Sequence, residues 1–464
     1  MEEQNLSEEN ASAKQDRYDL TTGSILTKLL LLSLPTTGTQ IVQMAYNLAD
    51  SFWLGHLNSG AVAASGSVGI FMWLAMCLQS YGAKGTEIGV AQNLGRKDNR
   101  ATQGYLQNAF FISVVLGIGC GLFLILLRHP LIAFFHIQEP EVVQAAVNYL
   151  AIIAVGIPFT YINATISAAF NSSGNSAKPF LVNCIGLVAN IVLDPIFIFV
   201  MGLGVIGAAI ATILCQVLSC VLMVLALRRY KHETFSGMKL MVWPQLVYVK
   251  SIFRWATPVA FETFFFTFFI LIISRFVSAF GSGALAVQRI GSQVDSMSYM
   301  VGDGFAIALT AFIGQNYGAG HFDRIRKGFW VATAIMVTWG TFATLLMVFG
   351  NRFIFNAFLP NEPQVVAMGA TYLLIIARCQ IVACLEGVGR SVSRGMGKTF
   401  FTSLYSVLTN VFRIYLAWVL SRGALRQDGI WWAISISAFL RGAGIFLLGV
   451  YALWRMMSKK IDST

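Results

Sequence analysis

The tetrapeptide Gln92-Asn93-Leu94-Gly95 recurs as Gln315-Asn316-Tyr317-Gly318, which lies 223 residues further along the chain (315 − 92). Several other pairs keep the same separation: Pro35 and Pro258, Gly60-Ala61-Val62-Ala63 and Gly283-Ala284-Leu285-Ala286, Gly174 and Gly397. This separation is far longer than the period of roughly 20–50 residues that marks a solenoid repeat. A duplication of this length in an apolar chain predicts two homologous membrane bundles, a construction that many secondary transporters share.

The composition is that of a membrane protein. The 464 residues are 56% hydrophobic and 11% charged, with a mean hydropathy of +0.68, whereas soluble domains have about 25% charged residues. Apolar runs of about 20 residues or more can cross a bilayer. They predict twelve spans, at 27–54, 60–91, 103–128, 143–171, 177–201, 205–227, 250–279, 283–316, 328–350, 365–391, 398–421 and 429–456.

We therefore expect an all-α membrane protein with twelve transmembrane helices in two pseudo-symmetric six-helix bundles. Six is an even number, so both bundles begin on the same side of the membrane and are parallel repeats, with a substrate path between them. The expected parts are a disordered cytoplasmic N-terminus, a first lobe, a cytoplasmic linker, a second lobe and a cytoplasmic tail, at 1–26, 27–229, 230–249, 250–457 and 458–464. The N-terminal segment lacks the pattern of a cleaved signal peptide.

The net charge of +11 is explained by membrane topology. Lys and Arg cluster in alternate loops, with roughly twenty-one on one side of the membrane and about four on the other. The positive-inside rule then places both termini in the cytoplasm, and because topology accounts for the charge we expect no binding of nucleic acid. The seven cysteines lack ligand spacing, and the five histidines lie in loops or at span ends, so no resident metal site or organic cofactor is expected.

Ionisable residues inside predicted spans are candidates for function, because their burial in lipid is costly. The first half has Asp50 near the outer end of its first span and Asp194 in its fifth, with Asn190 one helical turn earlier on the same face. Asn163 and Thr212 can add oxygen ligands if the six helices enclose one pocket. Two carboxylates in a low-dielectric pocket resist ionising together, so the pocket favours uptake of a proton or of a hard cation such as Na⁺.

Pro35 precedes Asp50 in the same helix, and it removes a backbone hydrogen bond where that helix could bend when the acid changes charge. Each acid also has a simpler interpretation. Asp50 is then a helix cap near the outer surface, and Asp194 is a polar contact between helices.

The second half has different acids. Glu262 follows Pro258 by four residues inside a run of phenylalanines that includes Phe265. A carboxylate among aromatic rings suits an organic cation, although most phenylalanines are expected to face lipid or core. Three further acids are expected to line the cavity and four arginines to neutralise the acids: Asp295, Asp303 and Glu386; Arg275, Arg289, Arg413 and Arg441.

Together, four motifs resemble those of the multidrug and toxic compound extrusion (MATE) transporters over nearly the whole hydrophobic length. The matching stretches are Pro35 with Ala49-Asp50-Ser51-Phe52-Trp53-Leu54-Gly55, Gly89-Val90-Ala91-Gln92-Asn93-Leu94-Gly95, Gly314-Gln315-Asn316-Tyr317-Gly318-Ala319-Gly320, and Asn190 to Asp194 with Pro195. The resemblance implies twelve helices in two six-helix lobes that open as a V. It also implies export of amphipathic, often cationic compounds in exchange for H⁺ or Na⁺.

The resemblance has features of two branches of that family. Asp50, Asn163, Asn190, Asp194 and Thr212 match the acidic cation-coupling pocket of the branch related to the DNA-damage-inducible F proteins. Glu262 resembles the seventh-span acid of the branch typified by sodium-driven norfloxacin exporters. In that branch an aspartate of the second lobe accompanies this acid. The aspartate has no clear match in this sequence, and Glu386 is the candidate to replace it. This mixture leaves the choice between H⁺ and Na⁺ open.

We thus expect a drug antiporter with no enzymatic activity, which acts as a monomer in the inner membrane of a bacterium. The alternatives are a flippase for a lipid-linked saccharide, which tends to have a more basic cavity, and a membrane-embedded enzyme, for which no nucleophile–base or metal constellation is present.

The 223-residue offset also indicates different roles for the two halves. At this offset Asp50 corresponds to Ile273 in the second half, and Glu262 corresponds to Thr39 in the first. The scaffold was duplicated but the acids were not, so ion coupling is expected chiefly in the first half and substrate contacts in the second.

Overall fold

The structure is a computed structural model that describes residues 18–461 apart from 138, 231, 233 and 359–361. Most of the N-terminus expected to be disordered (1–17) and the end of the tail (462–464) lie outside the described residues. The last residues of the N-terminal segment are packed, because Leu20 is 1% exposed. Helices also extend into segments expected to be linker and tail, since one begins at Leu246 and another ends at Ile461.

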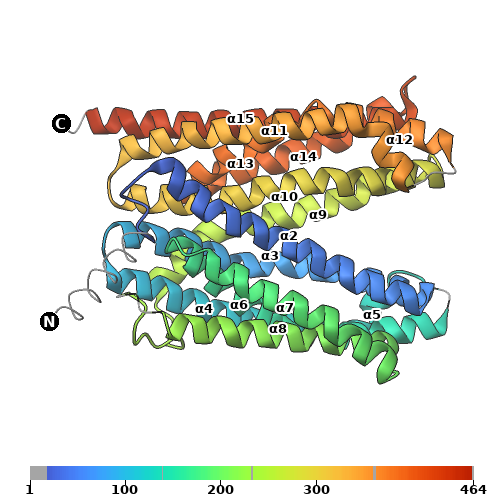
Figure 1. The fold of residues 1–464 in the computed structure, drawn as a ribbon, viewed down its shortest axis with the longest axis horizontal. Helices are drawn as coiled ribbons and strands as arrows, with labels where there is room; N and C mark the ends of the chain where they lie inside the picture. Colours follow the sequence, from blue (N-terminus) through green and yellow to red (C-terminus); the bar gives the residue numbers. More distant parts are fainter. Residues whose placement is uncertain (1–17, 138, 231, 233, 359–361, 462–464) are drawn as a thin grey trace, which may run out of the picture. The chain divides into compact units, whose positions relative to one another are not determined.

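The described residues of the first half form the predicted six spans and one short helix (Figure 1). In chain order the elements are α2 (Ile25–Leu57), α3 (Ser59–Gly95), α4 (Asn99–Leu126), the short α5 (Arg128–Ala133), α6 (Pro140–Ser172), α7 (Ala177–Pro195) with its π-helical continuation η1 (Ile196–Val200), and α8 (Gly204–Arg228). The π-helical turn begins after Pro195, which has no N–H to continue the α-helical ladder.

The second half has the same order of six spans, but it has no counterpart of the short α5 among the described residues, and one of its spans is divided in two. Its elements are α9 (Leu246–Ser278), α10 (Ser282–Gly318), α11 (Phe322–Phe358), α12 (Pro363–Ala377), α13 (Gln380–Gly395), α14 (Thr399–Ser421) and α15 (Arg426–Ile461). The span predicted at 365–391 is two helices, α12 and α13, that meet at 44°. The N–H of Cys379 bonds to the carbonyl of Ile376 at 3.1 Å, an i→i−3 turn that ends α12. No proline or glycine marks this break, so the sequence pattern predicted one continuous helix.

The chain forms two compact units whose limits fall inside α2 and α9. Among the described residues, one unit comprises 18–23 and 34–260, and the other comprises 24–33 and 261–461. Both limits lie within three residues of a proline of the repeat, Pro35 in α2 and Pro258 in α9. The helix nevertheless continues through each proline. These two positions lack an intrahelical hydrogen bond, so they are the natural points of bending in the two helices.

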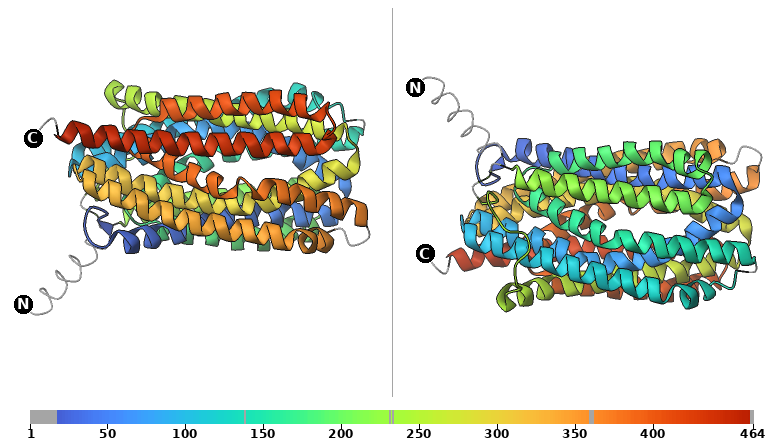
Figure 2. Two further views of the ribbon diagram at one scale, coloured as in Figure 1. Left: turned by 90° about the horizontal axis from the view of Figure 1, so that it is seen from above. Right: turned by 90° about the horizontal axis from the view of Figure 1, so that it is seen from below.

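Helices of each unit run side by side along their length (Figure 2). In the first unit α6 packs against α3, α4 and α8, and in the second α13 and α14 pack against α15. Close approach explains one glycine of the repeat. Gly174 has a left-handed φ of +83°, its counterpart Gly397 has +71°, and a Cβ on Gly174 would lie 2.2 Å from the carbonyl oxygen of Tyr18. Only glycine fits such a position without strain.

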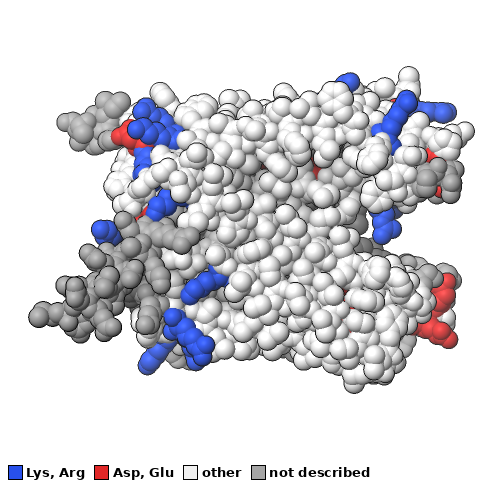
Figure 3. Space-filling model, viewed as in Figure 1, with Lys and Arg blue, Asp and Glu red and all other residues white. Residues whose placement is uncertain are grey.

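Large apolar side chains cover the outer surfaces of the helices. Leu34, Val200, Phe349 and Phe353 are 70–82% exposed. In Figure 3 the Lys and Arg side chains gather toward the helix ends, and few charged side chains lie along the middle of that face. Exposed apolar residues on helices of this length are expected when the surrounding medium is lipid. Eleven helices, or twelve spans when α12 and α13 count as one, are long and apolar enough to cross a membrane among the described residues.

Candidate functional site

The two acids of the first half come together from α2 and α7. Asp194 and Asn190 are 0% exposed, and the Asn190 Nδ2 donates to the Asp194 Oδ1 at 3.0 Å. The carboxyl group of Asp50 interacts with the side chains of Asp194, Asn190 and Thr212. The structure therefore brings together four of the five residues that the sequence suggested for a cation-coupling pocket.

Local structure positions this group. Asn190 and Asp194 are one turn apart on α7, so their side chains share a face. Thr212 is on α8, where its hydroxyl donates to the carbonyl of Ala208 at 2.9 Å and so leaves its oxygen as an acceptor. Asp50 lies seven residues before the end of α2 at Leu57. A position inside the helix, away from its N-terminus, does not fit the alternative in which Asp50 caps the helix.

Unpaired oxygen atoms point to what the pocket can hold. The Asp50 Oδ1, Asn190 Oδ1 and Asp194 Oδ2 are all buried with no hydrogen-bond partner among the described residues. A buried acceptor without a partner costs about 1–3 kcal/mol, and more when it is charged. A proton shared by the two carboxyl groups, or a hard cation coordinated by these oxygens, would remove that cost.

Three further residues adjoin the acids, and the sequence reasoning missed them. Tyr46, Tyr149 and Cys215 each interact electrostatically with both Asp50 and Asp194. The Tyr46 hydroxyl donates to the carbonyl oxygen of Thr212 at 3.4 Å, which links α2 to α8. Helical spacing could have revealed Tyr46, because it lies one turn before Asp50 on the same face.

Asn163 is less closely tied to this group. It is half-buried on α6, and its Oδ1 also lacks a hydrogen-bond partner in the part of the chain that the structure describes. A third buried acid of the first half, Glu87, was not identified from the sequence. It is 4% exposed on α3 and pairs with Lys84 at 2.5 Å. The pattern Lys84–Glu87 at i, i+3 within an apolar span was the signal that could have found it.

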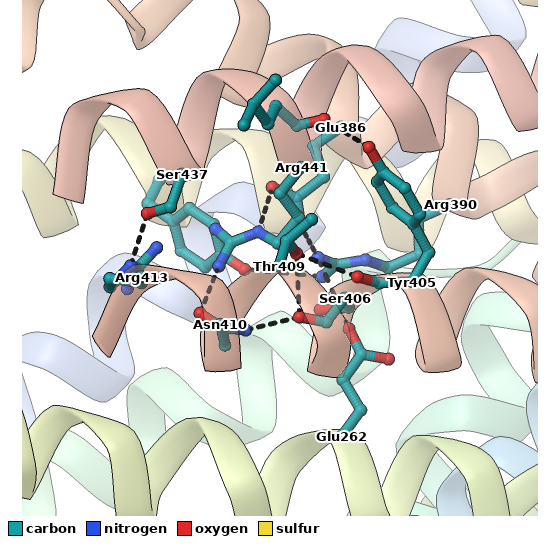
Figure 4. Close-up of polar contacts among 12 residues, drawn as sticks. Glu262, Glu386, Arg390, Tyr405, Ser406, Thr409, Asn410, Arg413, Ser437 and Arg441 are labelled. Carbon is teal, nitrogen blue, oxygen red and sulfur yellow. Dashed lines mark hydrogen bonds and ion pairs between the residues drawn. The ribbon is translucent and has the colours of Figure 1, made fainter. Parts of the chain in front are cut away.

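Two acids of the second half, Glu386 and Glu262, are paired with arginines (Figure 4). Glu386 on α13 is 1% exposed and lies between two guanidinium groups. It accepts a hydrogen bond from Arg390 and another from the Arg441 Nε at 2.9 Å. Arg441 also donates to the Asn410 Oδ1 at 3.2 Å. Glu386 is thus the centre of a buried ionic network that joins α13, α14 and α15.

Arg390 joins two more acids to this network. Its guanidinium lies 3.7 Å from the Glu262 carboxylate and 4.0 Å from that of Asp303. Glu262 accepts a hydrogen bond from the Ser403 hydroxyl at 2.8 Å. Asp295 is outside the network and accepts from the Gln380 Nε2 at 2.5 Å.

The expected arginine partners are partly wrong. Arg441 does pair with an acid, but Arg413 donates to the Ser437 hydroxyl at 2.7 Å, and Arg275 and Arg289 form no ion pair with any described acid. The main partner is Arg390, which the sequence reasoning counted with the basic residues of a cytoplasmic loop although it lies at the end of the span predicted at 365–391. It is 9% exposed inside α13, which continues beyond that span to Gly395.

Phenylalanines surround Glu262 less than the sequence suggested. Phe261, Phe264 and Phe268 are 44–56% exposed, as expected for residues that face lipid. Phe265 is half-buried and stacks on Phe261 and Phe269 of the same helix. The neighbours of the Glu262 carboxylate are Ser403 and Arg390, so its charge is already partly balanced.

Comparison with known proteins agrees with the duplicated architecture. The MatE family model matches the chain twice, at residues 35–196 and 258–419. The chain belongs to the MatE family. The two matches start at Pro35 and Pro258, so they have the same 223-residue offset as the repeated motifs.

Relatives within the MatE family have similar length. The chain is 27% identical to a probable multidrug resistance protein NorM of Thermotoga maritima over 80% of each chain. It is 26% identical to the probable multidrug resistance protein YpnP of Bacillus subtilis over 95% of this chain and 98% of that one. A FAD transporter of Shewanella oneidensis is 24% identical over 78% of this chain and 80% of its own.

Solved structures share the fold. A crystal structure of MATE in the bent conformation superimposes with a TM-score of 0.89 at 21% identity and covers 97% of this chain and 99% of that one. A MOP superfamily transporter from Pyrococcus furiosus gives 0.88 at 20% identity, with 95% and 98% covered. The fold is therefore the all-helical, two-lobed MATE fold.

Proposed function

We propose that this MatE protein is a secondary active antiporter that exports amphipathic, often cationic compounds in exchange for H⁺ or Na⁺. The observation that carries the proposal is the buried pair of Asp50 and Asp194, whose unpaired oxygens favour binding of a cation. Relatives named as multidrug resistance proteins support the substrate class. No organic cofactor is needed for this activity, since the ion gradient supplies the energy.

The proposed cycle alternates between outward-open and inward-open states. Cation binding at Asp50 and Asp194 removes the repulsion between the two carboxylates and lets α2 bend near Pro35, and the substrate is released outward. Substrate from the cytoplasm then binds as the cation leaves inward. Each step uses an interaction that differs between the two states, which any ligand-driven transition requires.

We also propose that the protein lies in the inner membrane of a bacterium with both termini in the cytoplasm, and that it works as a monomer. The excess of Lys and Arg in alternate loops supports this orientation. Arg390 is buried inside α13 and no longer counts among the basic residues of the cytoplasmic loops. The number of Lys and Arg on the cytoplasmic side falls by one, and the excess over the other side remains.

Proteoliposomes can decide the coupling ion. Purified protein is expected to drive dye efflux under an imposed H⁺ or Na⁺ gradient when each is applied alone, and to do so with one ion much more strongly than the other. Efflux is followed by dye fluorescence, with protein-free liposomes as the control. If neither gradient drives any efflux of several amphipathic dyes, the antiporter proposal is wrong.

The Glu262→Gln variant tests the charge of the second lobe. Loss of one negative charge beside Arg390 is expected to weaken export of cationic dyes several-fold more than export of neutral ones, because only the cations are repelled. Asp323→Asn is the matched control, since that side chain is 55% exposed at the start of α11. Equal losses for both dye classes would instead point to a role of Glu262 in coupling or in structure.

A lipid-linked saccharide flippase is the second candidate. It is favoured by Arg413 of the second lobe, which is buried, forms no ion pair with a described acid and suits an anionic substrate group. Reconstituted protein that moved a fluorescent lipid-linked sugar between leaflets without an ion gradient would support this candidate.

A further inference from the structure

We propose that a pocket at the ends of α9 and α14 binds the phosphate headgroup of an anionic phospholipid. The pocket has a volume of about 360 Å³ and lies wholly within the second unit. Its walls include two arginines, a hydroxyl group and three aromatic rings: Arg275, Arg422, Ser421, Trp418, Phe276 and Phe280. This volume is within the range of roughly 300–1,000 Å³ that is typical of small-ligand sites.

The arginines give the pocket an uncompensated positive charge. No acidic residue lines it, and neither Arg275 nor Arg422 forms an ion pair with an acid in the described ranges of the chain. The Arg422 guanidinium lies 4.1 Å from the centre of the Trp418 ring. Stacking of this kind holds the planar guanidinium and leaves its edge free to donate hydrogen bonds to a phosphate.

The two arginines of the pocket differ from the two arginines that bind Glu386. Arg390 and Arg441, the buried arginines closest to acids, both contact Glu386. Arg275 and Arg422 instead line a cavity that has no acidic residue. Guanidinium groups bind phosphate, like carboxylate, through two parallel hydrogen bonds. The two helices end here with their C-termini, whose partial charge is negative. A phosphate must therefore be held by the arginine side chains and not by the helix ends.

The position of the pocket favours a lipid over a free anion. α9 ends at Ser278 and α14 at Ser421, so the pocket is at the level where membrane spans end and headgroups begin. Trp418 and Phe280 are 45% and 36% exposed beside the cations. Aromatic side chains are enriched at this level, where they contact the upper acyl chain while arginine contacts the headgroup.

The test uses full-length protein purified in detergent and native mass spectrometry with added lipid. Wild-type protein is expected to retain phosphatidylglycerol, while Arg275→Gln and Arg422→Gln each weaken retention on the order of tenfold, the effect of losing about one charge-assisted hydrogen bond. Arg352→Gln is the matched control, because Arg352 is exposed near the end of α11 and does not line the pocket. Arg275→Lys is expected to recover part of the binding, which a variant that merely failed to fold would not do.

The other ligands distinguish the source of the phosphate. Phosphatidylcholine is expected to bind more weakly than phosphatidylglycerol, because its choline group opposes the arginine charge. Inorganic phosphate at millimolar concentration is expected neither to bind nor to displace the lipid. Equal retention of phosphatidylglycerol by wild type and by the double variant Arg275→Gln/Arg422→Gln would overturn the proposal. Binding of free phosphate as tight as that of the lipid would overturn its assignment to a lipid.

Discussion

Asp194→Asn is expected to reduce ion-driven efflux strongly while leaving the fold intact. Asparagine has the same shape and keeps the oxygen that accepts from Asn190, but it has no charge and cannot take up a proton or neutralise a cation. The coupling between cation and substrate should fall by roughly 5- to 150-fold, the usual range of coupling between two sites. Dye efflux from proteoliposomes under the effective gradient measures the loss.

Asp50→Asn should cause a loss of the same kind, because the two carboxyl groups interact within one pocket. Substrate binding in the absence of a gradient should be retained by both variants, and so should the thermal unfolding temperature in detergent. If both variants kept full efflux, the proposed mechanism would be wrong. A large drop in unfolding temperature with Asp194→Asn would instead favour the simpler role of a polar contact between helices.

Glu386→Gln is expected to destabilise the second lobe more than any other single acid replacement. The carboxylate balances Arg390 and Arg441 at the same time, and all three side chains are at most 11% exposed. Removing one partner of a buried ion pair typically costs about 3–5 kcal/mol, because the remaining charge is left uncompensated. The loss should be visible as a lower unfolding temperature in detergent and a lower yield of monodisperse protein.

Asp303→Asn is the matched control for that replacement. Its side chain is 34% exposed and its carboxylate is 4.0 Å from the same Arg390 guanidinium. A pair with this exposure and distance contributes only about 0–1 kcal/mol. Equal destabilisation by the two variants would contradict the view that Glu386 is the centre of the network.

Some features of this protein could be predicted from sequence patterns, and others could not. The spans were predictable because lipid imposes a minimum apolar length on each helix, and the duplication was visible as a fixed offset between motifs. Asp50 and Asp194 were found because a charge is rare in an apolar span. The break between α12 and α13 at Cys379 was not predicted, because no helix-breaking residue marks it. Arg390 was counted with a cytoplasmic loop because it lies at the end of its predicted span, and the end of a span is read from hydropathy alone.

The sequence by itself determined the class of protein, the number of spans and the asymmetry of the acids between two copied halves. These properties follow from composition, length and periodicity, which can be read along the chain without knowing which residues contact one another. Only the tertiary structure decided which charges meet. Asp50 and Asp194 are 144 residues apart (194 − 50), and Glu386 joins two arginines from different helices. Such pairings depend on the rotation and depth of each packed helix, and many combinations of these satisfy the same hydropathy pattern.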